Sequence, residues 1–242
     1  MKTTFKLIAL MAMTVGLAFA SCQKDENNTN GSGNDGSTQG TISTDEWVDM
    51  GLPSGLMWAS CNVGANAPEE YGNYYAWAET ATKEHYDWST YNYCITEPDG
   101  DGSPYFVGLT KYNTLEEFGN IDNLTTLEAM DDAATTTLGN GARTPTSAEW
   151  QELLDNTTSE WTTLNGVRGC KFTAANGNAL FLPAAGFRCL SDHSPDGVAY
   201  WSSTLNTEHP DYALIFYADN NFYVGGSDRY NGHTVRAVSS AQ

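Results

Sequence analysis

Residues that could act in hydrolysis occur as close neighbours along the chain, at Asp192-His193-Ser194, Glu69-Glu70 and Asp131-Asp132. A Ser–His–Asp triad or a glycosidase carboxylate pair needs side chains that face one another across a substrate. Residues adjacent along a strand point to opposite faces and rarely do so. The sequence also has no Gly-x-Ser-x-Gly turn of the kind that presents a nucleophilic serine. We therefore expect no enzyme activity, with a hydrolase kept as a less favoured alternative.

Metal-ligating residues show little of the spacing that a metal site needs. The four histidines include no His-x-x-x-His pair, the arrangement that holds zinc on one helix face. Asp99-Gly-Asp101-Gly-Ser103 supplies oxygen atoms at alternate positions, as calcium loops do at their start. The twelfth position, however, is Thr110 and not the glutamate of an EF-hand. Asp99 and Asp101 are thus weak calcium candidates, and the favoured interpretation is that they form an acidic loop tip. No cofactor is expected.

Aromatic residues are dense between positions 71 and 93, in a segment rich in loop-forming residues. Aromatic rings flanked by carboxylates and amides suit sugars, whose C–H faces are apolar and whose rims are polar. The ligand-binding candidates are Tyr86, Trp88, Tyr91 and Tyr93. The alternative is that these rings form the core of a small domain. For Trp58, Trp77, Trp150 and Trp201 we expect a core role.

The first 21 residues have the form of a targeting segment. Lys2 and Lys6 precede an apolar run from Leu7 to Phe19, which is shorter than the roughly 20 residues that span a bilayer. Small residues then end at Cys22, and this resembles the lipobox of bacterial lipoproteins, although Phe19 stands where leucine is usual. The resemblance implies cleavage before Cys22 and acylation of its sulfur, whereas an ordinary secretory signal is the alternative.

The segment after Cys22 has the composition of an export signal followed by a polar tether. Gln23, Lys24, Asp25 and Glu26 resemble the surface-export signal of Bacteroidetes lipoproteins, with a plain polar linker as the alternative. The resemblance implies an outer-membrane lipoprotein that faces the cell exterior. Residues 22–44 are almost entirely polar or glycine, and such a coil of about 20 residues spans roughly 25 Å. Membrane contact is thus expected through the lipid anchor.

Composition limits what the remaining residues, 45–242, can be. Hydrophobic residues make up 40% of the chain, which is enough for a packed core. The abundance of Gly and Trp argues against a coiled coil. The net charge of −19, with 11 basic against 30 acidic residues, argues against nucleic acid as a partner. A single folded domain is predicted.

The expected elements are mostly antiparallel hairpins. Turn signals at Gly51–Gly55, Asn176-Gly177 and Asp219-Asn220 each separate two strand-like segments. Pro145 precedes a predicted helix in which Thr146 and Glu149 have capping-box spacing. A weaker helix is expected over Leu124 to Ala134, and long loops between Tyr86 and Asp122. The strand Thr234–Val238 should close the sheet. The fold class is therefore α+β.

The domain cysteines form an even set, and an exported domain enters an oxidising compartment. They are Cys61, Cys94, Cys170 and Cys189. Three pairings are open, and we slightly favour Cys61 with Cys94, which would stabilise the fold by about 3–4 kcal/mol. Pairing across the Asn176-Gly177 turn would set Cys170 opposite Pro183, away from Cys189. Buried thiols are the alternative.

Several ordered segments resemble the Fibrobacter succinogenes major paralogous domain. They are Gly51–Gly64, Glu70–Glu79, Arg143–Trp150, Leu182–Gly186, Tyr200–Ser203 and Val235–Val238. Arg143-Thr-Pro-Thr with Glu149-Trp150 also resembles sulfatase-modifying factors, which implies a C-type-lectin-like fold. The catalytic sulfatase-modifying factors use a second cysteine a few residues away from a Gly-Phe-Arg-Cys segment. In this chain no second cysteine lies close to Gly186-Phe-Arg-Cys189. The resemblance thus implies a non-catalytic domain that binds glycan or protein. Alternatives are a structural part of a surface assembly and, less favoured, a hydrolase or a formylglycine-generating-type oxidase.

Overall fold

The computed structural model describes residues 41–42, 46–101, 104–195, 197–219 and 221–240. The predictions for the signal segment, Cys22, the export residues Gln23 to Glu26 and most of the tether lie outside these residues. Within them, no helix is both long and apolar enough to cross a membrane.

Most of the described chain forms strands. They are β1 (Thr41–Ile42), β2 (Trp47–Asp49), β3 (Leu56–Asn62), β4 (Cys94–Pro98), β5 (Pro104–Leu109), β6 (Thr157–Leu164), β7 (Val167–Ala174), β8 (Asn178–Pro183), β9 (Phe187–Cys189), β10 (Asp192–Ser194), β11 (Val198–Leu205), β12 (Tyr212–Ala218), β13 (Phe222–Asp228) and β14 (Arg236–Ser240). The helices are α1 (Ala133–Leu138) and α2 (Ser147–Asn156), with 3₁₀ turns η1 (Glu116–Phe118) and η2 (Ala129–Asp131). The protein is therefore β-rich with two short α-helices.

The strands pair into several small open sheets. Their orders are β1-β8-β7-β6, β11-β12-β13, β14-β3-β2, β10-β9 and β4-β5. All pairs are antiparallel except β1 with β8. The three predicted hairpins are confirmed as β2–β3, β7–β8 and β12–β13. The predicted final strand pairs with β3 as β14, although it begins at Arg236.

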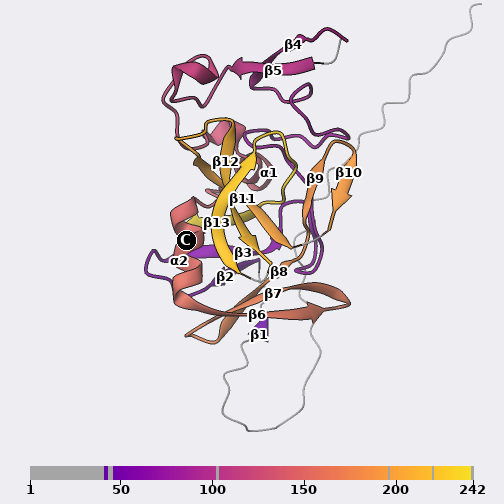
Figure 1. Ribbon diagram of the computed structural model, residues 1–242. Coiled ribbons are helices and arrows are strands. Elements are labelled where there is room, and N and C mark those ends of the chain that lie inside the picture. Colours follow the sequence, from indigo (N-terminus) through magenta and orange to yellow (C-terminus); the bar gives the residue numbers. More distant parts are fainter. Residues whose placement is uncertain (1–40, 43–45, 102–103, 196, 220, 241–242) are drawn as a thin grey trace, which may run out of the picture.

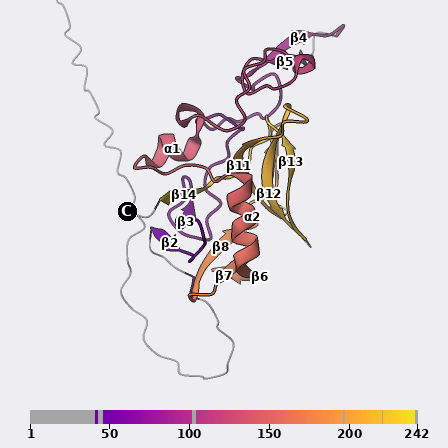
Figure 2. The same ribbon diagram turned by 90° about the vertical axis from the view of Figure 1, so that its left-hand side faces the viewer.

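The sheets are arranged along the molecule, with the β4–β5 hairpin at one end and β6–β7 at the other (Figures 1 and 2). Helix α2 lies beside the β11-β12-β13 sheet between these ends. Hairpin β4–β5 and turn η1 occupy part of the region from Tyr86 to Asp122 that was predicted as loop. Proline and glycine at both strand ends concealed this hairpin, because they weaken a strand signal.

Helix α2 begins as its sequence predicts. The Thr146 hydroxyl accepts from the Glu149 backbone N–H, and the Glu149 carboxylate accepts from the Thr146 N–H. Trp150 and Leu153 on one helix face are buried. The other predicted helix, 124–134, is wrong over most of its length: α1 begins at Ala133, where the Asp132 carboxylate accepts from the backbone N–H of Ala134.

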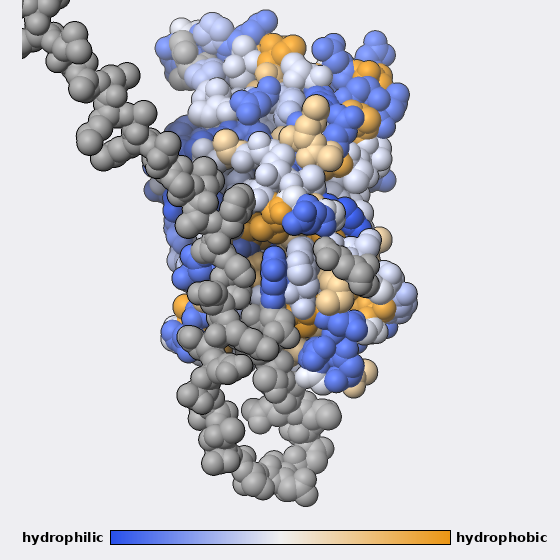
Figure 3. All heavy atoms as spheres, turned by 180° about the vertical axis from the view of Figure 1, so that it is seen from behind, coloured by the Kyte–Doolittle hydropathy of each residue, from blue (hydrophilic) through white to orange (hydrophobic). Residues whose placement is uncertain are grey.

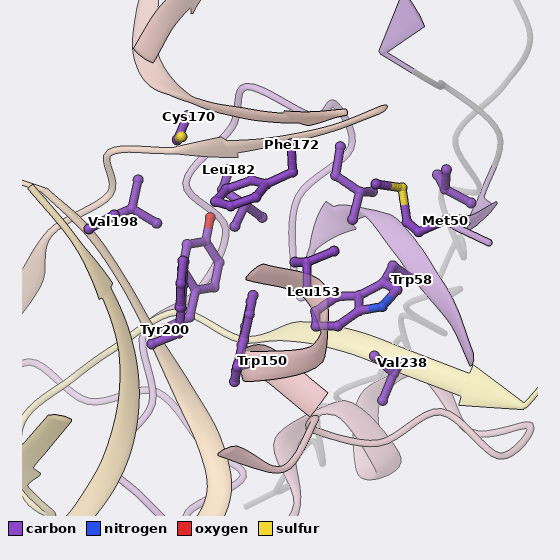
Figure 4. Close-up of a cluster of buried hydrophobic side chains, with 14 of the residues drawn as sticks. Met50, Trp58, Trp150, Leu153, Cys170, Phe172, Leu182, Val198, Tyr200 and Val238 are labelled. Atoms are coloured by element: carbon purple, nitrogen blue, oxygen red, sulfur yellow. The ribbon is translucent and has the colours of Figure 1, made fainter. Parts of the chain in front are cut away.

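The largest hydrophobic cluster forms around Trp150, between α2, β3 and β11–β12 (Figure 4). The Trp150 ring stacks on Phe216 with centroids 4.6 Å apart and planes 9° from parallel. It also contacts Trp58, at 4.8 Å between centroids. The predicted core role is confirmed for all four tryptophans, since Trp58, Trp77, Trp150 and Trp201 are at most 2% exposed.

The favoured disulfide between Cys61 and Cys94 is not formed. All four cysteines of the described residues are thiols. The Cys94 sulfur is turned toward the preceding loop, where it donates to the Trp88 carbonyl at 2.9 Å. Cys170 lies opposite Leu182, one residue from the predicted Pro183, and is fully buried. Of the two alternatives, the structure agrees with thiols.

Candidate functional site

Two of the four predicted ligand-binding aromatics, Tyr86 and Tyr91, are buried, although Tyr86 also lines the pocket described below. Tyr86 is 1% exposed and Tyr91 is 4% exposed. The Tyr86 hydroxyl donates to the Tyr74 carbonyl at 2.8 Å, and the Tyr91 hydroxyl donates to the Trp77 carbonyl at 2.9 Å. Both side chains therefore hold loops together through hydrogen bonds from their hydroxyls to backbone carbonyls.

Trp88 and Tyr93 are half-buried and both pack against the cluster that contains Tyr86 and Tyr91. Trp88 packs on Phe106 of β5 and on Tyr230, with centroids 4.6 and 4.9 Å away. The Tyr93 hydroxyl donates to the Asp131 carboxylate at 2.6 Å. The four predicted residues thus lie in one cluster, but two of the four rings are buried and they form no continuous exposed aromatic surface.

An open polar pocket of about 230 Å³ lies beside this aromatic region. Its walls come from the loop that precedes β4 and from Arg188 of β9. The lining residues are Gly72, Asn73, Tyr74, Thr82, Lys83, Glu84, Tyr86 and Arg188. Most of them carry hydrogen-bonding groups, and this chemistry suits a polar ligand better than an apolar one.

Tyr74 forms a fixed wall of the pocket. Its hydroxyl donates to the Ala185 carbonyl at 2.7 Å and lies 2.9 Å from Nε2 of His193. The His193 ring in turn meets the Tyr74 ring edge-on, at 5.2 Å between centroids. Burial raises the pKa of Tyr74, so the hydroxyl stays protonated.

Arg188 lies over the Tyr74 ring, with its guanidinium carbon 5.0 Å from the ring centroid. The backbone of Arg188 exchanges two hydrogen bonds with Gly232, at 2.8 and 2.9 Å. Hydrogen bonds thus hold the main chain of Arg188, and the Tyr74 ring is the contact of its side chain. Among the described residues, no hydrogen bond or ion pair engages the guanidinium.

Lys83, the other cation of the pocket, is already paired. Its Nζ lies 2.5 Å from the Glu79 carboxylate and donates to the Thr90 carbonyl at 2.7 Å. Glu79 is 4% exposed, and a buried carboxylate needs such a partner. Lys83 therefore has a structural role, and Arg188 is the cation available to a ligand.

Gly186 allows β9 to carry Arg188 to the pocket. Its φ is +58°, and a Cβ there would lie 1.7 Å from the Ser194 carbonyl oxygen. A residue with a side chain cannot occupy that space without moving β10. The segment Gly186-Phe-Arg-Cys189 is thus explained by packing and placement. Burial raises the pKa of the Cys189 thiol, which opposes the thiolate that an oxidase needs.

A serine, a histidine and an aspartate do meet, although not at the residues that the sequence pattern offered. Nδ1 of His85 lies 3.0 Å from the Ser191 hydroxyl, and its Nε2 lies 3.1 Å from the Asp87 carboxylate. The side chains of His85 and Asp87 are 43% and 27% exposed. Catalytic triads depend on a buried, water-excluded aspartate. We therefore interpret these contacts as structural ones that hold the β9–β10 turn against the loop that precedes β4.

The neighbouring acids Asp131 and Asp132 point to different places, as expected. The Asp131 carboxylate contacts Lys111, Tyr93 and Tyr112, at 2.5 to 2.6 Å. Asp132 caps α1 and accepts from the Thr144 hydroxyl at 2.6 Å. Neither acid is available as half of a catalytic pair.

The calcium candidates lie at the tip of the β4–β5 hairpin. Asp99 and Asp101 are exposed, and the Asp99 carboxylate accepts from the Asp101 backbone N–H at 2.9 Å. In the part of the chain that the structure describes, no three His, Cys, Asp or Glu side chains are grouped as metal ligands would be. The tip is an aspartate-stabilised turn.

Sequence reasoning missed Arg188, Asn73 and Lys83 as pocket residues. The sequence held no signal for Arg188, because the pocket that it lines forms only when β9 meets the loop before β4 in the folded chain. Comparisons with protein-family models, with curated proteins and with solved structures found no match.

Proposed function

We propose that this protein is a lipid-anchored outer-membrane protein whose folded domain binds a glycan without catalysis. The polar pocket walled by Tyr74 and Arg188 carries the proposal. The side-chain donors and acceptors that line it suit the hydroxylated rim of a sugar ring.

The anchor and the fold family are part of the same proposal. The resemblance of the N-terminal segment to a lipobox and an export tag supports acylation at Cys22 and display on the cell exterior. The resemblance to Fibrobacter succinogenes major paralogous domains supports a C-type-lectin-like fold. A β-rich chain with two short helices agrees with that fold class at the coarse level.

Binding is tested with a glycan array probed with the full chain and with two tryptophan variants. Thr82→Trp places a ring into the pocket from an exposed lining residue. Thr163→Trp makes the same change at an exposed position of β6, away from the pocket. We expect binding by the native chain and by T163W, and loss in T82W. Binding that survives T82W unchanged, or silence of the native chain across all glycan classes, would refute the pocket.

Display is tested by treating intact cells with a protease that does not enter them. The proposal predicts that the domain is removed while a periplasmic control protein remains. A protected domain, or one recovered from the medium with an unmodified N-terminus, would contradict the anchored, outward-facing arrangement.

A structural role in a surface assembly is the second candidate, and the projecting β4–β5 hairpin favours it (Figures 1 and 2). Ile95, Tyr105 and Val107 on this hairpin are 42–48% exposed. Elsewhere on the described surface, apolar residues lie in small separated groups between hydrophilic ones in the view from behind (Figure 3). Exposed apolar residues on a protruding element are typical of protein contacts. This candidate predicts self-association or a co-purified partner that Ile95→Ser with Val107→Ser abolishes.

A further inference from the structure

The basic residues of the domain divide sharply by how their charge is engaged. Four of them form ion pairs, namely Lys83, Lys111, Arg143 and Lys171. The buried Arg229 and Arg236 donate to backbone carbonyls and to neutral side chains. Arg168 and Arg188 differ, since the guanidinium of each lies over an aromatic ring and has no hydrogen bond or ion pair to a described residue. Only Arg188 of these two lines a pocket that the structure shows.

The surroundings of Arg188 bear on what it can bind. Its guanidinium lies over the Tyr74 ring and makes no hydrogen bond or ion pair with a described residue, which leaves its N–H groups able to donate to a ligand. Two parallel N–H donors of a guanidinium match the two oxygens of a carboxylate. Tyr74 is itself held by Ala185 and His193, so the cation–π contact restricts the guanidinium before a ligand arrives and less side-chain entropy is lost on binding.

The rest of the pocket indicates what bears the carboxylate. The Asn73 amide, the Thr82 hydroxyl and the Glu84 carboxylate line it together with the tyrosine ring. These groups can bond to hydroxyls, whereas a peptide side chain would find few apolar neighbours. A volume of about 230 Å³ is of the order that one or two sugar rings occupy.

Net charge restricts the ligand further. With a formal charge of −19, the protein repels densely charged polyanions at long range. Local attraction at a single guanidinium therefore favours a ligand with one carboxylate per ring over a heavily sulfated polymer.

We propose that the pocket binds a uronic acid residue of an acidic glycan and that Arg188 recognises its carboxylate. This inference rests on the proposed function, because it names the ligand class of the same pocket.

The test measures binding of trigalacturonate and of its methyl ester to the full chain by calorimetry. The ester keeps the hydroxyls and adds one methyl group per ring but has no charge, so the comparison needs no change in the protein. We expect the acid to bind at least about tenfold more tightly, the effect of losing one charge-assisted contact of about 1.4 kcal/mol. Equal affinity for acid and ester would overturn the carboxylate assignment while leaving the proposed glycan binding intact.

Variants then locate the effect. Arg188→Gln should remove the preference for the acid, and Arg188→Lys, which keeps the charge but not the fork, should retain part of it. Arg168→Gln, the matched change at the other ring-stacked arginine, should leave both affinities unchanged. A preference for the acid that persists in R188Q overturns the assignment to Arg188. Tighter binding of inorganic sulfate, or of a peptide C-terminus, than of trigalacturonate overturns the sugar assignment. Absence of all sugar binding refutes the proposed function itself.

Discussion

Arg188 of β9 lies over the ring of Tyr74, which precedes it by more than a hundred residues, at 5.0 Å from ring centroid to guanidinium carbon. The two residues meet because separate backbone contacts hold each of them. Tyr74 is bonded through its hydroxyl to Ala185, one residue before Gly186, and Arg188 is bonded through its backbone to Gly232. The pocket is therefore a product of tertiary structure.

Two substitutions at Tyr74 should separate the contribution of its hydroxyl from that of its ring. Tyr74→Phe removes the hydrogen bond to Ala185 and should lower the free energy of unfolding by about 1 kcal/mol. The ring under Arg188 remains, so ligand binding should persist. Tyr74→Leu also removes the ring and should cost about 3 kcal/mol and weaken binding. Urea unfolding and calorimetry measure the two effects, and equal binding by Y74L would contradict the role of the ring.

Two glycines provide a matched pair for the placement of β9. Gly186 and Gly177 both have φ in the left-handed region, at +58° and +90°. A Cβ at Gly177 meets nothing within 4 Å, so Gly177→Ala should cost only about 1 kcal/mol of backbone strain. Gly186→Ala adds a clash with the Ser194 carbonyl and should cost about 3 kcal/mol or more. Urea midpoints that fall equally in both variants would refute the packing account.

Stability should depend on pH through His233. This imidazole is 2% exposed, and burial lowers its pKa to about 3. The folded protein therefore keeps His233 neutral, whereas the unfolded chain takes up a proton below about pH 6.5. Stability is complete above pH 6.5 and falls with decreasing pH down to about 3, by roughly 1 kcal/mol per pH unit.

Unfolding free energies measured between pH 7 and pH 4 in the native chain and in His233→Gln test this dependence. The glutamine can still contact Ser227, which lies 2.8 Å from Nε2 of the histidine. We expect a shallower pH dependence in H233Q. An unchanged pH dependence of the unfolding free energy in H233Q would show that groups other than His233 cause it.

The cysteines should behave as thiols of unequal reactivity. Burial raises the pKa of Cys170 to about 12 and that of Cys94 to about 11, so neither should react with a thiol reagent in the folded protein. Alkylation after unfolding without a reductant should then modify all four domain cysteines, as counted by mass spectrometry. A mass that lacks two of these modifications, restored by reductant, would show a disulfide.

Local signals in the sequence were sufficient for several elements. The capping box of α2, the Asn176-Gly177 turn and the four core tryptophans follow from nearby residues and their periodicity, and all were predicted correctly. The β4–β5 hairpin was missed because proline and glycine mask its strands, and α1 was misplaced because Asp132, its N-cap, lies within the segment expected to be helical.

From the sequence, the candidate site could be located only as a segment of the chain. The aromatic-rich segment adjoins the polar pocket, which Tyr86 lines, while Tyr91 is buried away from it. Spacing along a loop does not determine which rings point to solvent, since this depends on which backbone carbonyls lie within reach of each hydroxyl. Arg188 and Tyr74 could not be paired in advance for the same reason.

The most direct test of the account follows the Arg188 side chain itself during binding. In ¹H–¹⁵N spectra of the full chain, the Nε–H signal of Arg188 can be assigned as the one lost in Arg188→Lys. Titration with trigalacturonate should shift this signal in a saturable way, and the Nε–H signal of Arg168 should not move. A titration in which trigalacturonate binds while the Arg188 signal stays in place would contradict the account.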